Sequence, residues 1–196
     1  MKRDAADLRT SLLRLAATQA GYFTAAQALQ VGYSYPAQLY HQRRGEWIRV
    51  DHGIYRLAVW PETENADLVR WTLWSRGHGV VSHDTALAVH ELGDVLPAKV
   101  HLLVPRNFRS ADPSVVLHRG DIRDDEIDER VGFRVATPTR AILDSAVDMD
   151  IDRLAGAIRD ALERGVTTAS RLRGGAGEFG QSAAVAIESA LRQLRR

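Results

Sequence analysis

Residues 21–57 constrain the fold of this chain more than any other stretch. The segment GYFTAAQALQVGYSYPAQLYHQRRGEWIRVDHGIYRL holds two short helix signals separated by a turn, followed by two β-rich runs joined by Asp51-His52-Gly53. Two helices joined by a tight turn and followed by a hairpin are typical of a winged helix-turn-helix, whose second helix can enter the major groove of DNA. The sequence therefore predicts such a module at the N-terminal end.

Capping residues mark the ends of the predicted helices. Leucines at helical spacing predict a first amphipathic helix over residues 4–19. Thr24 and Gln27 have the spacing of a capping box and begin the second helix. Ser34 is a good N-cap for the third helix, which we expect to continue to about Arg44.

The third helix presents a mixed polar surface. We expect Ala37 with Tyr40 or His41 to face the first two helices, which leaves glutamine, arginine and tyrosine side chains outside. These side chains can reach DNA, because glutamine pairs with adenine, arginine with guanine or phosphate, and tyrosine with phosphate or a thymine methyl group. The residues predicted to face outward are Tyr35, Gln38, Gln42, Arg43 and, in part, Tyr40 and His41.

Residues 47–50 and 54–57 alternate apolar and polar side chains, which predicts a β-hairpin, the wing. We expect Arg49 and Arg56 to share its polar face, with His52 at the tip. A wing with basic residues can rest on a phosphate or in the minor groove. The full set of predicted DNA-binding residues is Tyr35, Gln38, His41, Gln42, Arg43, Arg44, Arg49, His52 and Arg56.

Charge is unevenly distributed along the chain. Residues 1–59 hold eight Lys and Arg against four Asp and Glu, although the net formal charge of the whole chain is only +1. This basic part suits a polyanion such as double-stranded DNA. The alternative is that these charges form a solvated face on a winged helix-turn-helix that binds another protein. Because basic residues occur together on the first helix, the third helix and the hairpin, we favour DNA.

The amino-acid composition excludes several other kinds of protein and site. The chain has no cysteine, which excludes disulfides, zinc–thiolate sites and thiol nucleophiles. No apolar run approaches the roughly 20 residues of a membrane span, and the N-terminal residues show no export signal. We therefore expect a cytoplasmic protein without a membrane partner.

Beyond Pro61 the pattern becomes a mixture of helices and strands, which predicts a second domain. The fold class is α+β, with a winged helix-turn-helix over residues 1–60 and a small mixed sheet packed with helices over residues 61–196. Trp71 and Trp74 are expected in its core. The predicted strands are 100–105, 115–118 and 133–136, and the predicted helices are 64–76, one that begins at Ser82, 139–147, 150–164, 168–173 and 182–195.

The second domain contains several histidines, an acidic stretch and a glycine-rich stretch that could in principle bind a metal ion or a cofactor. His83 and His90 share a helix face, but no third ligand accompanies them, so we expect no metal site. The acidic residues of 121–129 lack the spacing of a calcium loop and are interpreted as a solvated turn or a partner surface. The glycine-rich residues 174–177 follow a helix rather than a strand and are interpreted as a flexible connector, not a phosphate loop. We expect no cofactor.

The sequence contains no clear pattern of catalytic residues. A nuclease would need a carboxylate pair and a lysine on a strand, and Asp112 with Lys99 do not form such a set by spacing. No catalytic residue is therefore assigned. A DNA-processing protein with a nuclease-like C-terminal domain stays as an alternative.

The chain resembles the AbiEi-family antitoxins of type IV toxin–antitoxin systems, in their actinobacterial form. The resemblance extends to about residue 173, and the tail after it matches no pattern of the family. The pieces that carry it are, in order, GYFTAAQAL, VGYSYPAQLYH, RRGEWIRVDHGIYRL, SHDTALAVHELGDVLPAKVHLLVP and ATPTRAILD.

The resemblance implies a protein that is not an enzyme. Its winged helix-turn-helix would bind repeats in its own promoter and repress transcription. Apart from the resemblance, one such module reads only a short site, so we expect more than one copy of the protein on the DNA. Its second domain would counteract a co-encoded nucleotidyltransferase toxin of the AbiEii/MenT type. By position, the residues carried over for DNA contact are Arg43, Arg44, Arg49 and Arg56, with Gln38 and His41 as weaker base readers. Two further alternatives are an antitoxin without DNA affinity and a generic winged helix-turn-helix regulator.

Overall fold

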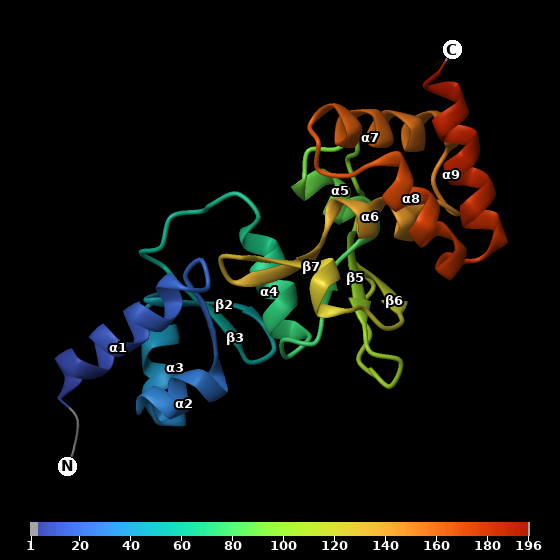
Figure 1. The fold of residues 1–196 in the computed structure, drawn as a ribbon. Coiled ribbons are helices and arrows are strands. Elements are labelled where there is room, and N and C mark those ends of the chain that lie inside the picture. The colour runs from blue at the N-terminus through green and yellow to red at the C-terminus, as the bar shows by residue number, and fades with distance from the viewer. Residues whose placement is uncertain (1–3, 196) are drawn as a thin grey trace. The chain divides into compact units, whose positions relative to one another are not determined.

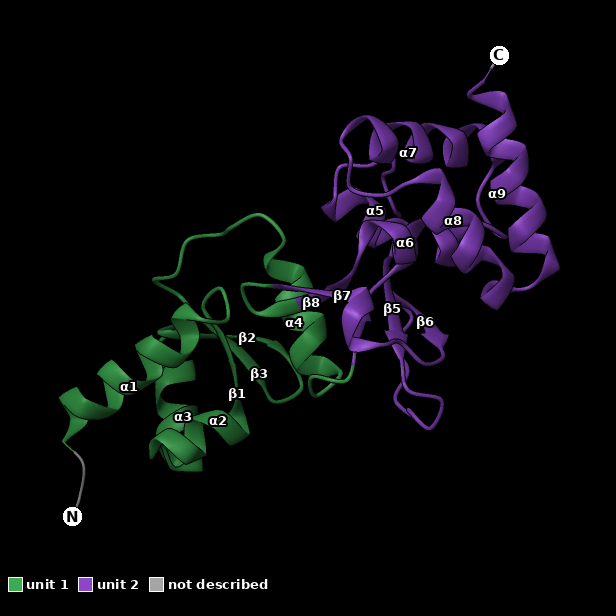
Figure 2. Ribbon diagram, in the orientation of Figure 1, with its two compact units in different colours: residues 1–78, 130–133 green, residues 79–129, 134–196 purple. Residues whose placement is uncertain are grey.

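The computed structural model describes residues 4–195, which divide into two compact units (Figure 1, Figure 2). Unit 1 holds the described residues up to His78 together with residues 130–133, and unit 2 holds Gly79–Glu129 and the described residues from Arg134 onward. This division by packing differs from the expected division at residue 60, because the helix after Pro61 packs with unit 1. The functional division into residues 1–60 and 61–196 stays a prediction.

Unit 1 contains the predicted winged helix-turn-helix and one more helix. Its antiparallel sheet has the strand order β1-β3-β2. The helices are α1 (Ala5–Ala17), α2 (Ala25–Val31), α3 (Tyr35–Arg43) and α4 (Ala66–Trp74), and the strands are β1 (Tyr22–Thr24), β2 (Trp47–Asp51) and β3 (Ile54–Leu57). Strand β1 was not expected from the sequence, because three residues are too few to show a period of two.

The predicted caps hold the helix-turn-helix in place. Gln27 N donates to Thr24 Oγ1 over 3.1 Å, and Thr24 N donates to Gln27 Oε1 over 2.8 Å, which completes the capping box of α2. Ser34 Oγ accepts from Ala37 N over 3.4 Å at the start of α3. Between the two helices Gly32 has φ of 124°, a conformation that favours glycine.

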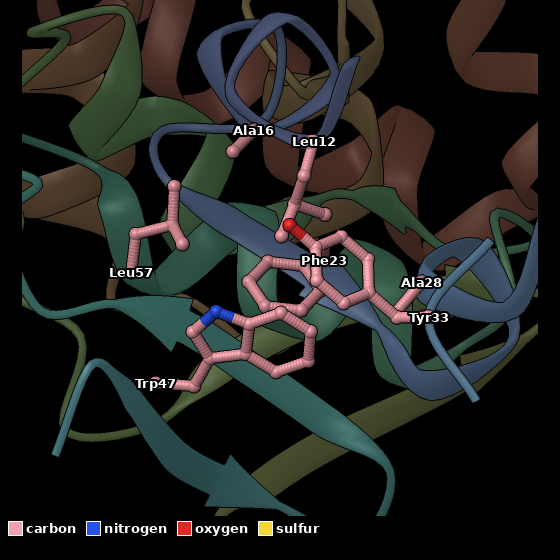
Figure 3. Packing of buried hydrophobic residues seen from close by; sticks show 7 residues of the cluster. All are labelled: Leu12, Ala16, Phe23, Ala28, Tyr33, Trp47 and Leu57. Atoms are coloured by element: carbon pink, nitrogen blue, oxygen red, sulfur yellow. The ribbon is translucent and has the colours of Figure 1, made fainter. Parts of the chain in front are cut away.

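An aromatic cluster fixes α3 on the sheet. Figure 3 shows the Phe23 and Tyr33 rings beside the Trp47 indole. The Trp47 ring meets Phe23 edge-on at 4.7 Å and Tyr33 edge-on at 5.1 Å between ring centroids. His41 of α3 also contacts it, and its ring stacks on the Trp47 ring at 5.0 Å. One residue of β2 thus ties the sheet to both ends of the third helix.

Unit 2 is a five-stranded mixed sheet with the strand order β6-β5-β4-β8-β7 and helices packed on it. Strand β4 pairs antiparallel with β5, while β5 with β6 and β4 with β8 are parallel pairs. The predicted α+β class is confirmed. The strands are β4 (Val80–Val81), β5 (Val100–Val104), β6 (Val115–Arg119), β7 (Ile127–Arg130) and β8 (Phe133–Ala136). The helices are α5 (His83–Val89), α6 (Pro138–Ser145), α7 (Ile151–Glu163), α8 (Ala169–Ala176) and α9 (Gln181–Gln193), with the short 3₁₀ turns η1 (Asp124–Glu126) and η2 (Gly177–Phe179).

The interpretation of residues 174–177 as a flexible connector is wrong. Gly174 and Gly175 lie within α8, and Gly177 begins η2. A Cβ atom at Gly175 would lie 2.6 Å from Leu143 Cδ1 of α6. The glycine therefore permits the close approach of α8 to α6 rather than chain flexibility.

The acidic residues of 121–129 form only in part the solvated turn that we expected. This stretch contributes to η1 and β7, and Glu126 within it is largely buried against Arg140 of α6. Arg140 Nη1 donates to Glu126 Oε2 over 2.8 Å, and its Nε donates to Asp144 Oδ1 over 2.9 Å. Burial, opposed by Arg140, raises the pKa of Asp144 to about 6. The sequence did not reveal this buried charge network.

Among the described residues, we find no helix that is both long enough and apolar enough to span a membrane.

Candidate nucleic-acid interface

Helix α3 presents one face to solvent. Tyr35 is 67% exposed, and Leu39 and Tyr40 are exposed as well. Positions 35 and 39 are one helical turn apart and therefore lie on the same side of the helix. Near the C-terminal end of α3, Arg43 is also exposed. The sequence prediction did not include Leu39, although its spacing of four residues from Tyr35 would have placed it on this face.

The expectation that Gln38 faces outward is wrong. Its side chain is only 3% exposed, and its Nε2 donates to Ala25 O and to Tyr33 O, each over 3.1 Å. These carbonyls belong to the start of α2 and to the turn before α3. Gln38 therefore joins the two helices of the helix-turn-helix and does not face outward to read a base.

Replacing Gln38 by alanine is expected to lower the free energy of unfolding of unit 1 by about 1–3 kcal/mol, because two buried carbonyls lose their donor. Gln42, on the same helix but only partly buried, is the matched control. Gln42→Ala should leave stability within about 0.5 kcal/mol of the wild type. Urea unfolding of both variants measures the difference, and equal stabilities would contradict the assignment of Gln38.

Arg43 and Arg44 are adjacent but have different surroundings. Arg44 Nε donates to Glu46 Oε1 over 2.9 Å, and its Nη1 donates to Tyr40 Oη over 3.0 Å. These hydrogen bonds, that to Tyr40 first, raise the pKa of Arg44. The Arg43 side chain has no hydrogen-bond or ion-pair partner within residues 4–195. Its guanidinium is therefore the more available of the two for a phosphate or a guanine.

His41 is less available to DNA than the sequence suggested. Its ring stacks on Trp47, and its Nδ1 lies 2.6 Å from Glu46 Oε2. The hydrogen bond from His41 is the main cause that lowers the pKa of Glu46. Glu46 thus holds the last turn of α3 through His41 and Arg44 together.

The two arginines of the wing do not share a face, which corrects our expectation. In the β2–β3 register Arg49 lies opposite Tyr55, whereas Arg56 lies opposite Ile48, and residues opposite each other share a face. Arg56 is largely buried, with its Nη2 3.4 Å from Glu62 Oε1. It therefore lies on the opposite face of the wing from Arg49.

Arg49 and His52 form the exposed tip of the wing. Arg49 Nη2 lies 3.2 Å from His52 Nδ1, and Arg49 Nε donates to Asp51 O over 3.3 Å. The turn is anchored to the start of α2, because Ala25 N donates to Gly53 O over 2.8 Å. The tip of the wing is thus held against the helix-turn-helix that carries α3.

Most of the predicted DNA-binding residues lie in the winged helix-turn-helix of unit 1, but they differ in exposure and in the partners of their side chains. Tyr35, Arg43 and Arg49 are exposed cationic or aromatic side chains without a structural role in the core. These features define a winged helix-turn-helix protein whose third helix is presented to solvent.

Comparison with known proteins identifies the class more closely. Residues 11–58 match the family described as "Transcriptional regulator, AbiEi antitoxin". The predicted resemblance is confirmed over this stretch, which contains α3 and the wing. No curated protein matches the sequence.

The fold has a solved counterpart. The structure is similar to the crystal structure of the RV2827C protein from Mycobacterium tuberculosis, with a TM-score of 0.60 and 15% sequence identity. The alignment covers 97% of this chain and 79% of that chain. At this identity the comparison supports the fold alone.

Proposed function

We propose that this protein represses its own promoter and acts as the antitoxin of a type IV toxin–antitoxin pair. In this account α3 enters the major groove of promoter DNA, and the tip of the wing contacts the adjacent backbone. The residues proposed for contact are Tyr35, Gln42, Arg43 and Arg49, with Arg44 and His52 in supporting positions. The protein acts by binding rather than by catalysis.

The exposed face of α3 is the observation that carries this proposal. A structural helix would bury its apolar and aromatic residues, yet Tyr35, Leu39 and Tyr40 are exposed beside an unpaired Arg43. The core places this face rigidly, through Gln38 on one side and Trp47 on the other. Rigid presentation of tyrosine and arginine is what base and phosphate contacts require.

The antitoxin role rests on the family match and on the second unit. A repressor that bound one short DNA site would need little beyond unit 1, whereas unit 2 forms a separate compact body with its own sheet. We propose that unit 2 counteracts a co-encoded nucleotidyltransferase toxin, and that several copies of the protein bind the promoter together. The protein is proposed to work in the cytoplasm.

Adjacent arginines provide a matched test of the DNA interface. Arg43→Ala is expected to weaken binding to the native upstream DNA by about 1–3 kcal/mol, because an unpaired guanidinium is lost. Arg44→Ala should cost less than about 1 kcal/mol, since Glu46 already neutralises this charge in part. Fluorescence anisotropy with labelled DNA measures both affinities. Equal losses, or a larger loss for Arg44→Ala, would contradict the proposed arrangement.

The antitoxin role has a separate test. Expression of the neighbouring nucleotidyltransferase alone should arrest growth, and co-expression of this protein should restore it. A variant lacking DNA affinity, such as Arg43→Ala with Arg49→Ala, should still restore growth when both genes are expressed from a foreign promoter. Failure of the wild type to restore growth would refute the antitoxin role and leave a repressor alone.

A further inference from the structure

Three histidines of unit 2 come together at neighbouring strands of the sheet. His83 begins α5 just after β4 and Ser82, His101 lies in β5, and His118 lies in β6. The ligand nitrogens of the three side chains all lie within 4.8 Å of one another. Strand order explains the convergence, because β4, β5 and β6 are consecutive in the sheet.

Backbone hydrogen bonds and the strand register fix the positions of these three histidines. Ser82 N donates to His101 O over 3.1 Å, and His101 N donates to Thr85 Oγ1 over 2.9 Å. The parallel register sets Leu103 opposite His118, so His118 lies diagonally from His101 on the same face. His83 has φ of 50°, a left-handed conformation that is uncommon for a residue with a Cβ atom. Such a residue persists only where its surroundings fix it.

The spacing of the nitrogens is close to that of a metal site. His101 Nδ1 lies 3.0 Å from His118 Nε2, and the His83 ring stacks on the His118 ring at 3.4 Å. In a tetrahedral zinc site with Zn–N distances of about 2.0–2.1 Å, two ligand nitrogens lie about 3.3 Å apart. Two of the nitrogens thus already have nearly this separation. The stacked ring needs a side-chain rotation to bring its nitrogen to the same point.

The His83 ring already has a hydrogen-bond partner on one nitrogen, as metal-binding histidines commonly do. His83 Nδ1 lies 3.0 Å from Ser82 Oγ, which leaves Nε2 as the nitrogen for an ion. A hydrogen bond to the other ring nitrogen fixes the tautomer and orientation of a ligating imidazole. Ser82 is the residue before α5, but its side chain makes no capping hydrogen bond to that helix. Its hydroxyl serves His83 instead.

Burial favours the uncharged form of all three rings, and two of the rings are partly exposed. Burial lowers the pKa of His83 to about 3 and that of His118 to about 4, and it also lowers the pKa of His101. Neutral imidazole is the form that binds a metal. His101 and His118 are only partly buried, so an ion can reach them from solution.

Two carboxylates near the rings favour a cation, and one arginine opposes it. The carboxylates of Asp84 and Asp148 act on both His101 and His118 in the direction that favours positive charge. Arg140 acts on His83 in the opposite direction. Its guanidinium, however, is paired with Glu126 and Asp144.

We propose that His83, His101 and His118 bind one divalent transition-metal ion, with Zn²⁺ as the best fit. Three imidazoles suit zinc, copper, nickel or iron, whereas calcium and magnesium prefer oxygen ligands. A fourth position would stay open for water or for a nearby carboxylate. The site replaces the His83–His90 pair considered from the sequence, because His90 Nε2 is bonded to Ala136 O over 2.8 Å and takes no part.

Zinc binding by protein without an affinity tag tests this site. After dialysis against EDTA, calorimetric titration with Zn²⁺ should show one ion per chain. His118→Ala should weaken the affinity at least about ten-fold. His78→Ala is the control, since His78 is exposed and lies outside the cluster, and it should bind zinc as the wild type does. No uptake by the wild type, or equal uptake by His118→Ala, would overturn the proposal.

A measurement on the wild type covers the case in which the variant fails to fold. Titration with Zn²⁺ followed by NMR of the imidazole ¹⁵N nuclei should shift resonances of His83, His101 and His118. Shifts confined to other histidines, such as His52 or His78, would contradict the site. Neither experiment involves DNA or toxin, so their outcome is independent of the proposed function.

Discussion

Replacement of Trp47 by alanine is expected to lower the free energy of unfolding of unit 1 by about 3–5 kcal/mol, the usual cost of removing a large buried aromatic side chain. Trp47 is buried and contacts Phe23, Tyr33, His41 and Tyr55. The loss is a large share of the 5–15 kcal/mol that stabilises a typical domain. Because this ring supports α3, the variant should also lose DNA affinity.

Ile48→Ala provides the control for Trp47. Ile48 is the next residue of β2 but is 39% exposed, so its replacement should cost less than about 1 kcal/mol. Urea unfolding followed through the amide resonances of each unit would separate unit 1 from unit 2. A Trp47→Ala loss below 1 kcal/mol in unit 1 would contradict the role of the aromatic cluster.

Replacement of Arg140 by methionine is expected to destabilise unit 2 by about 3–5 kcal/mol. The side chain of Arg140 is 9% exposed, and those of its partners Glu126 and Asp144 are similarly buried. Removing the cation would leave the buried Asp144 carboxylate without a counter-charge and Glu126 with only the exposed Arg123 as its partner. An uncompensated buried charge costs far more than the net stability of the pair. Asp121 O would also lose its donor, Arg140 Nη2, which lies 3.2 Å away.

Arg123 is the matched control for Arg140. It forms ion pairs with Asp125, Glu126 and Glu178, but its side chain is 59% exposed. Arg123→Met should therefore cost less than about 1 kcal/mol. Thermal unfolding monitored by circular dichroism compares the two variants. Changing Glu126 and Asp144 to apolar residues together with Arg140→Met should recover most of the loss, and failure to recover it would show that burial of charge is not the cause.

Local sequence signals were sufficient for the helix-turn-helix and the wing. The capping box at Thr24, the N-cap at Ser34 and the strand over residues 54–57 were each predicted from neighbours within a few positions, and the structure confirms all three. Such signals can be recognised in the sequence because helix ends and hairpins are stabilised by groups that are close in sequence.

Side-chain direction was less predictable. Gln38 was expected outside because glutamine is polar, but its amide is buried where two backbone carbonyls need a donor. The position of Arg56 depends on the cross-strand register and on α4, which packs against β3. Both positions depend on how helices and strands pack on one another, so the spacing of polar residues along one element favoured the wrong face.

The histidine cluster lay furthest from what the sequence could show. His101 and His118 are 17 residues apart and meet only because β5 and β6 pair in parallel. A helical spacing rule selected His83 with His90 instead. Metal-site motifs based on one helix miss ligands that converge across neighbouring strands.

Binding to promoter DNA as a function of salt tests the central claim most directly. If the protein neutralises about six phosphates, the logarithm of its affinity for the native upstream DNA should fall with the logarithm of salt concentration with a slope of about −5. Scrambled DNA of equal length should bind more weakly at every salt concentration. Arg43→Ala should reduce the slope by about one if it contacts a phosphate. Equal affinity for native and scrambled DNA, or no binding at low salt, would contradict the account.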